Sequence, residues 1–454
     1  MSSIDDLSVP DDYPARPSIV VKTEILRHNS VKEKKRIHIT ILLSLTYFVF
    51  GIGVGLYGPL YPLKADILLV PSYIFGIVLS CNYLAAILFY PVASKMVSDI
   101  TCKQSIFTGI FIIGCCRIFF GALEQMRYKL EFILISFAIQ VVEGTGIAVL
   151  VVSTFIILFS EETRKANYNS VWVMAFTVLG ISVGPICGEV VHKAFGFGIP
   201  FYGIGVITVL SSFLLLALIV EPGQKISHKD IPVISWMKET KMLPYFIIIF
   251  VTFNFTGVLA VVLELYLQQF HLDKVYLGLL FGIPSLACGL SAPGWWWMTK
   301  KGCNSLLLTC IASILIIAAL ILIVPASFTA LDVSLVNVSV ALLLQGLGSG
   351  GKLACSVYAA NRELKTRRTI NGTPEPQPLL IPTIFTFGAF SGFFTGCFVS
   401  GFTFYYSGIK NTSYFLYSLE AISVITAVIF AFKSNYRVPR RPVTIEETQP
   451  ILQS

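Results

Sequence analysis

The sequence is dominated by long apolar stretches, and these constrain the fold more than any other feature. Lipid offers backbone groups no hydrogen-bond partner, so a chain crosses a membrane as helices of about 20 apolar residues that satisfy these groups internally. We therefore predict two sets of six spanning helices. The first set covers residues 37–63, 71–94, 105–122, 130–159, 168–192 and 199–220, and the second covers 243–270, 275–298, 304–326, 332–360, 378–407 and 412–432.

The composition supports a membrane protein. Only 13% of the 454 residues are charged, whereas about 25% are charged in an ordinary soluble domain. This disfavours most soluble enzymes. We predict an all-α membrane protein with a tail at 1–36, a six-helix half at 37–220, a linker at 221–242, a second half at 243–432 and a tail at 433–454.

The basic residues predict the orientation, because Lys and Arg concentrate on the cytoplasmic side of membrane proteins. Of the 33 Lys and Arg, 25 fall in the tails and even-numbered connections, and six fall on the opposite side. The other two, Arg117 and Lys352, lie inside predicted helices. Both termini are thus predicted to be cytoplasmic, and the net charge of +8 indicates topology rather than nucleic-acid binding.

Two small-residue motifs recur in the two predicted halves. Residues 143–146 read Glu-Gly-Thr-Gly, and residues 345–348, which lie 202 positions later, read Gln-Gly-Leu-Gly. The glycines at 180, 184 and 188 have counterparts 212 positions later at 392, 396 and, as Ser, at 400. Glycine is common in membrane helices for close packing, but two motifs in matching order favour a duplication.

The stripe Gly180, Gly184, Pro185 and Gly188 resembles the antiporter signature of the major facilitator superfamily, with Glu189 in place of its final Gly. Residues 140–148 resemble the fourth-helix motif of the same superfamily. Residues 58–66, 194–201 and 276–279 are similar to the vesicular amine transporter family, closest to its vesicular polyamine transporter branch. The resemblance implies the twelve-helix major facilitator fold, a monomer, and transport by alternating access.

The chain departs from the superfamily in its cytoplasmic gating motifs. The motif between the second and third helices survives only as Asp99 and Lys103, and its second-half counterpart keeps Gly294 but has Met298 where an acid is expected. Phe50 stands where the monoamine branch has an acid, which disfavours a monoamine substrate.

Charged side chains at membrane depth are costly, so they usually have a partner or a function. The main candidate for binding a proton or substrate is Glu143. It lies in the predicted fourth helix, and the resemblance to the major facilitator superfamily implies that this helix lines the central cavity. Glu189 and Glu264 lie nearer the outward ends of their helices, where they are either interfacial carboxylates or part of the substrate path.

The basic residues at depth leave alternatives open. Lys352 is either an ion-pair partner for a carboxylate of the other half, with Glu143 a candidate, or an anion-binding group. Arg117 is interpreted as a side chain that extends to the interface. Pro185 can kink its helix, and the glycine stripe around it is predicted to pack at a seam between the halves.

The C-terminal tail contains Glu447, Ile451 and Leu452, which resemble an acidic dileucine sorting signal and suggest sorting adaptors as partners. No nucleotide-binding loop or metal-ligand spacing occurs in a credible context. We therefore expect no enzyme activity, no cofactor, no metal and no nucleic-acid partner.

We predict a proton-coupled secondary antiporter in an intracellular vesicle or plasma membrane. Its substrate would be a small organic cation, polyamine- or amine-like, bound near the middle of the bilayer between rocking halves. Two alternatives remain: an organic-anion transporter that uses Lys352 and Arg117, and a non-transporting sensor or scaffold with the same fold.

Overall fold

The computed structural model describes residues 19–159, 163–219, 241–323, 334–371 and 379–435, and every regular element in these ranges is helical. The long helices are α1 (Ile19–Ile67), α2 (Ser72–Asp99), α3 (Cys102–Gly121), α4 (Lys129–Phe159), α5 (Thr163–Phe195), α6 (Gly198–Leu218), α7 (Leu243–Leu267), α8 (Lys274–Lys300), α9 (Ser305–Ile323), α10 (Leu335–Asn371) and α11 (Leu380–Asn435). Two short 3₁₀ helices, η1 (Ala122–Gln125) and η4 (Gln268–Phe270), follow α3 and α7.

The last helix accounts for two of the predicted spans. The described part of the chain contains 11 helices long and apolar enough to cross a membrane, and the last covers 52 residues. A single span needs only about 20. At Gly408 the backbone leaves the helical region, with φ 70° and ψ −171°, a conformation that glycine adopts without steric cost. The predicted spans at 378–407 and 412–432 therefore lie on either side of this break.

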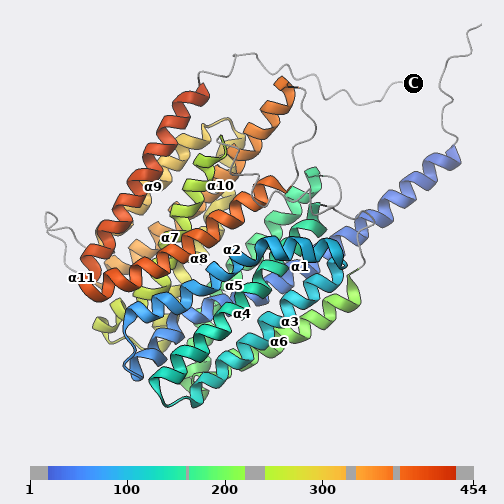
Figure 1. Cartoon of the computed structure of the whole chain (residues 1–454). Helices are drawn as coiled ribbons and strands as arrows, with labels where there is room; N and C mark the ends of the chain where they lie inside the picture. Colours follow the sequence, from blue (N-terminus) through green and yellow to red (C-terminus); the bar gives the residue numbers. More distant parts are fainter. Residues whose placement is uncertain (1–18, 160–162, 220–240, 324–333, 372–378, 436–454) are drawn as a thin grey trace, which may run out of the picture.

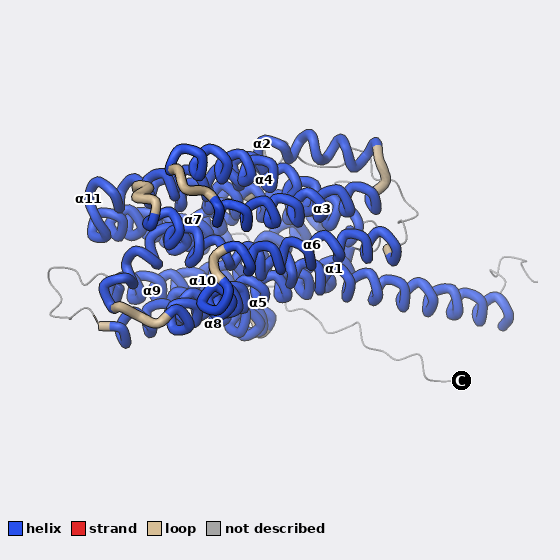
Figure 2. The backbone as a smooth tube through the Cα atoms, turned by 90° about the horizontal axis from the view of Figure 1, so that it is seen from below, coloured by secondary structure: helices blue, strands red, loops and turns tan. Residues whose placement is uncertain are grey.

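The helices form two groups with the same internal arrangement (Figures 1 and 2). In the first group α1 packs on α5, α2 on α4, and α3 on α6. In the second group α7 packs on α11, α8 on α10, and α9 on α11. Since α11 supplies both the eleventh and the twelfth span, the second set of pairs repeats the first. The predicted fold class, two six-helix halves of an all-α membrane protein, is confirmed.

The glycine stripe of α5 packs inside the first half. A side-chain carbon at Gly180 would collide with the carbonyl oxygen of Phe48 on α1, and one at Gly184 would collide with that of Ile52. The prediction that this stripe forms the seam between the halves is therefore wrong. The stripe lies on the face of α5 that meets α1, where only glycine lets the two backbones approach so closely.

The second half repeats this contact. On α11, a side-chain carbon at Gly392 would collide with the carbonyl oxygen of Phe250, and one at Gly396 with that of Asn254 on α7. Both glycines lie 212 positions after their α5 counterparts, and both oxygens lie 202 positions after theirs. These are the offsets of the two sequence repeats, so the duplicated motifs build duplicated contacts.

The halves meet along α5–α8, α2–α11 and α1–α7. At the α5–α8 contact the small residue belongs to α8, because a side-chain carbon at Gly278 would lie 2.7 Å from the carbonyl oxygen of Pro185. This contact runs toward the end of the bundle where α5 ends and α8 begins. We call it the tail-distal end, because α1 begins and α11 ends at the other.

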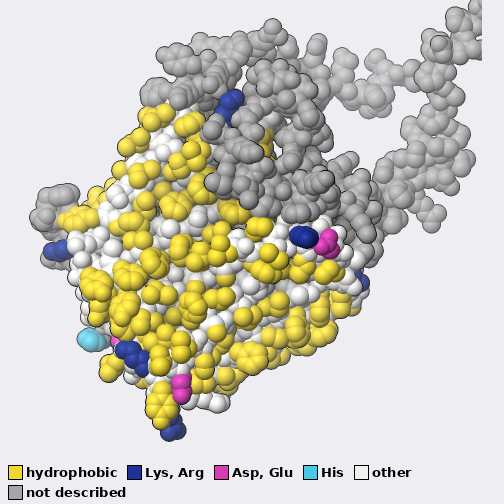
Figure 3. Space-filling view, viewed as in Figure 1, with side chains coloured by type: hydrophobic (Ala, Val, Ile, Leu, Met, Phe, Trp, Pro, Cys, Tyr) yellow, Lys and Arg dark blue, Asp and Glu magenta, His cyan; other side chains and the backbone are white. Residues whose placement is uncertain are grey.

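The surface matches a lipid environment. On the face shown in Figure 3, hydrophobic side chains cover the middle, and the described charged side chains lie toward the ends. Large apolar side chains on three outer helices are more than half exposed, among them Leu210, Leu290 and Ile314. A soluble protein rarely exposes such continuous apolar area.

Candidate substrate cavity and buried charges

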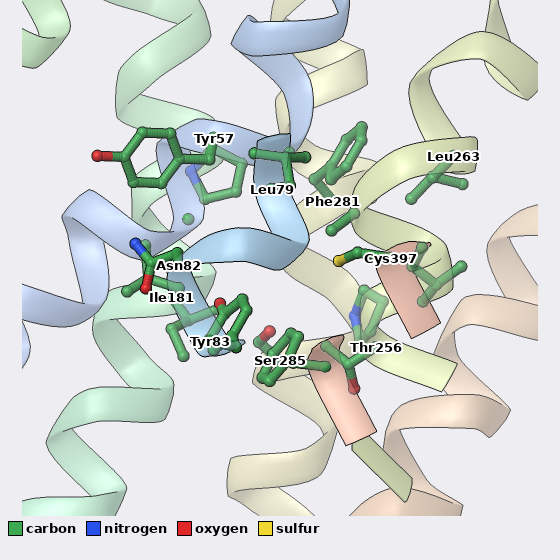
Figure 4. Close-up of a pocket in the computed structure, with 18 of the residues that line it drawn as sticks. Tyr57, Leu79, Asn82, Tyr83, Ile181, Thr256, Leu263, Phe281, Ser285 and Cys397 are labelled. Atoms are coloured by element: carbon green, nitrogen blue, oxygen red, sulfur yellow. The ribbon is translucent and has the colours of Figure 1, made fainter. Parts of the chain in front are cut away.

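A cavity lies between the two halves and is lined by both (Figure 4). Tyr57, Asn82 and Tyr83 face it from the first half, and Phe281 and Cys397 face it from the second. Glu143 and Gln140 of α4 also line it. The wall is therefore largely aromatic and aliphatic, with a few polar groups on the first-half side, which is the usual character of a small-molecule site.

Among the described residues that line this cavity, Glu143 is the only one with a charged side chain. It is 1% exposed. Its Oε2 atom accepts hydrogen bonds from the Tyr57 hydroxyl at 2.6 Å and the Asn82 amide at 3.4 Å, and its Oε1 atom accepts one from Arg117 Nε at 3.3 Å. The Asn82 amide also donates to Gln140 at 2.7 Å. The carboxylate is thus held by three donors from α1, α2 and α3.

Arg117 is a partner of this carboxylate, so its interpretation as an interfacial side chain is wrong. It is fully buried, and besides Glu143 it donates to the Phe50 carbonyl at 2.9 Å and the Thr208 hydroxyl at 3.2 Å. Gly53 leaves room for the guanidinium, which a side chain at that position would strike. A buried arginine is tolerated here because its guanidinium nitrogens donate hydrogen bonds to these acceptors and its charge is balanced by the Glu143 carboxylate.

The second half contains its own buried ion pair. Lys352 Nζ lies 3.0 and 2.9 Å from the two carboxylate oxygens of Glu420, and both side chains are at most 1% exposed. The suggested pair of Lys352 with Glu143 is therefore wrong, because each charge is neutralised within its own half. Glu420 was missed, although a Glu inside the predicted span at 412–432 was an available signal.

The other two candidate carboxylates are buried rather than interfacial. Glu264 is 2% exposed, and both of its oxygens accept from the Gln268 amide, at 3.1 and 3.2 Å. Glu189 is fully buried, and neither of its oxygens has a hydrogen-bond partner among the described residues. Neither residue lines the cavity. The interpretation of Glu189 and Glu264 as interfacial carboxylates is therefore wrong, because both side chains are buried.

Polar contacts join the halves at the tail-distal end. Lys193 Nζ on α5 donates to Asp273 Oδ1, just before α8, at 2.7 Å. His192 Nε2 lies 3.0 Å from Lys274 Nζ. The hydrogen bond from Lys193 lowers the pKa of the Asp273 carboxyl. The Lys193 and Asp273 side chains are 54% and 44% exposed, so this bridge is open to water.

The remaining predicted positions are spread over the bundle. Asp99 ends α2, Lys103 lies in the first turn of α3, and Gly294 lies on an exposed part of α8. The predicted sorting residues Glu447, Ile451 and Leu452 lie outside the described residues.

Aromatic rings also cross the interface between the halves. Tyr83 of α2 stacks on Phe393 of α11, with centroids 4.5 Å apart and planes 4° from parallel. Both rings line the cavity. Among the described residues, the cavity is thus bounded by one carboxylate on the first-half side and by aromatic side chains from both halves.

The fold and cavity define a polytopic helical membrane protein with a central cavity between two repeated halves. The chain belongs to the Major Facilitator Superfamily, whose sequence profile matches residues 43–373. The family predicted from the sequence motifs is therefore confirmed.

Named relatives agree with this assignment. The chain is 28% identical over 243 residues to the mouse MFS-type transporter SLC18B1 and 26% identical over 249 residues to the human protein of that name. Each match covers 52% of both chains, so the chain spans about half the length of the curated relatives it matches.

A solved structure shares the fold. The human organic anion transporter MFSD10 (TETRAN) superposes with a TM-score of 0.61, covering 87% of this chain and 99% of its own. At 14% identity this likeness concerns the fold alone.

Proposed function

We propose that the chain is a proton-coupled antiporter that moves a small organic cation, polyamine- or amine-like, by alternating access. The observation that carries the proposal is the cavity between the halves, where Glu143 is the only charged residue among the described ones that line it. A carboxylate attracts an ammonium group directly. Tyr83, Phe281 and Phe393 also line the cavity, and aromatic rings can attract a cation.

The relatives support transport as the activity, because the mouse and human proteins are named as MFS-type transporters. The polyamine-like substrate, an intracellular vesicle or the plasma membrane as the location, cytoplasmic termini and sorting adaptors at the C-terminal tail are parts of the same proposal. They rest on the sequence motifs and on the distribution of Lys and Arg.

The organic-anion alternative has less support. It requires Lys352 and Arg117 to face the substrate, yet neither lines the cavity. Each is already paired with a carboxylate, Lys352 with Glu420 and Arg117 with Glu143. An anion would have to displace a buried carboxylate to reach either charge, which leaves that carboxylate unpaired at several kcal/mol of cost.

Transport in liposomes tests the proposal. The purified protein is reconstituted, a pH gradient is imposed, and uptake of radiolabelled spermidine is followed with and without the gradient. Uptake should follow the gradient. Glu143→Gln should weaken spermidine binding roughly 10- to 100-fold, because a hydrogen bond to a charged group contributes about 1.5–3 kcal/mol.

Glu131→Gln is the matched control, because Glu131 lies on the same helix but is exposed. It should transport like the wild type. Uptake that is equal with and without the pH gradient, or that is unchanged in Glu143→Gln, contradicts the proposal. Inhibition by an organic anion that is lost in Lys352→Ala would favour the anion alternative, and binding without uptake would favour the sensor.

A further inference from the structure

Glu189 is unlike every other buried carboxylate in the described part of the chain. Glu143 is paired with Arg117, Glu420 with Lys352, and Glu264 accepts from Gln268. Neither oxygen of Glu189 has a hydrogen-bond partner among the residues that the structure describes, and the side chain has no exposed surface. A buried ionised carboxylate without hydrogen bonds is very costly, whereas the neutral acid is tolerated far better. The geometry therefore accommodates Glu189 as a carboxylic acid.

The surroundings of Glu189 come from both halves. Glu189 lies on α5, one turn after Pro185, whose backbone is approached by Gly278 of α8. Lys274 and Glu264, both of the second half, interact with it electrostatically. The titratable and charged groups around this contact are Asp66 of α1, His192 and Lys193 of α5, Glu264 of α7, and Asp273 and Lys274 at the start of α8.

This placement links protonation to the positions of the halves. Separation of the halves at the tail-distal end would move α8 away from this part of α5 and let water reach Glu189, where the carboxylate is well solvated. When they close, an ionised Glu189 would be buried without a hydrogen bond. Closure at this end is thus favoured only after a proton has bound to one carboxylate oxygen.

We propose that Glu189 carries the coupling proton, at a site separate from the substrate carboxylate Glu143. The inference rests on the proposed antiport. A proton from the tail-distal solution forms the O–H bond of the acid while that end is open, and the halves then close over it. Pro185 lines the cavity one turn away, so a substrate cation arriving there favours release of this proton toward the cavity.

The sequence supports a role particular to this chain. In the superfamily signature that residues 180–188 resemble, the next position is Gly, whereas this chain has Glu189. An acid at a helix contact that otherwise uses small residues costs stability. A functional role explains why the chain carries a group that the packing alone does not need.

Two measurements on Glu189→Gln test the proposal, since Gln imitates the neutral acid but cannot release a proton. In liposomes, spermidine-for-spermidine exchange without a gradient should stay within about twofold of the wild type, while accumulation driven by the pH gradient should be lost. In infrared spectra at neutral pH, the carbonyl band of protonated carboxylic acids should be present in the wild type and should lose intensity in Glu189→Gln.

Glu131→Gln is the control, because Glu131 is an exposed carboxylate on α4 that is not among the groups around Glu189. It should keep gradient-driven accumulation and the infrared band. Accumulation that survives in Glu189→Gln, or that is lost in Glu131→Gln as well, overturns the proposal. If Glu189→Gln does not fold, Glu189→Asp should keep both coupling and the band, and loss of either also overturns it.

The two proposals fail in different ways. Wild-type protein that shows no gradient-driven uptake contradicts the antiport function whatever Glu189 does. Wild-type protein that accumulates spermidine but shows no carboxylic acid band that depends on Glu189 contradicts only the proton site.

Discussion

At the scale of single residues, the stability of each half depends on how its buried charged side chains are paired. Arg117 has four acceptors: the Glu143 carboxylate, the carbonyls of Phe50 and Val49, and the Thr208 hydroxyl. Among the described residues, Arg117 is the only positively charged side chain within hydrogen-bond reach of Glu143. The two partners are therefore unequal, and removing the arginine should be the more damaging change.

Arg117→Met should destabilise the folded protein by about 3–5 kcal/mol, because it leaves a buried carboxylate without its counter-charge. The apparent melting temperature in detergent measures this. Glu143→Gln should lower it less, since Arg117 keeps its other acceptors. The double variant Arg117→Met/Glu143→Gln should be more stable than Arg117→Met alone. A double variant that is as unstable as the single one would show that Arg117 acts through packing rather than charge.

At the scale of helices, close backbone contacts set the arrangement of each half. The α1–α5 contact and its repeat between α7 and α11 both rest on glycines facing carbonyl oxygens. Pro185 lies within the same α5 segment and faces the cavity. The glycines thus fix α5 against α1 while its other face remains available for the second half and for substrate.

Gly184→Leu should reduce the yield of folded protein severely, because a side chain there drives α1 and α5 apart. Overpacking in a well-packed interior typically costs about 1–3 kcal/mol, and here the obstacle is backbone that cannot rotate away. Gly203→Leu provides the control, since nothing lies within 4 Å of a side-chain carbon at that position on α6. Size-exclusion profiles in detergent compare the two. Equal yields of folded protein would contradict this account of the stripe.

At the scale of the whole molecule, the halves are joined at the tail-distal end by groups of different exposure. The side chains of the Lys193–Asp273 bridge are 54% and 44% exposed, whereas Glu189, one turn earlier on α5, is fully buried. The pKa of Asp273 is lowered from its ordinary value of 3.8. The bridge is therefore fully formed above that value and is lost only as the pH falls through the lowered pKa.

Asp273→Asn should change the rate of transport without moving the pH at which transport is half-maximal. The reason is that Asp273 stays ionised throughout the neutral and mildly acidic range, so it contributes no pH dependence there. Uptake of spermidine measured across that range tests this. A shift of the half-maximal pH would instead assign the pH dependence to this exposed bridge.

Much of the fold followed from the sequence. The predicted spans agree with the helices because a run of apolar residues is a local property and lipid enforces helix along it. The break at Gly408 falls between the predicted spans 378–407 and 412–432. The candidate site was recovered in part, since Glu143 lines the cavity but the partners suggested for the charged residues were wrong.

The sequence by itself determined the number of spans, the duplication, the family and the positions where charge enters the membrane. Only the tertiary structure decided which charge meets which. Arg117 pairs with Glu143 and Lys352 with Glu420, while Glu189 accepts no hydrogen bond from any described residue. The physical reason is that a buried ion pair depends on how two helices are rotated and how closely they approach. Residues far apart in the chain, such as Gly53 beside Arg117, control that approach.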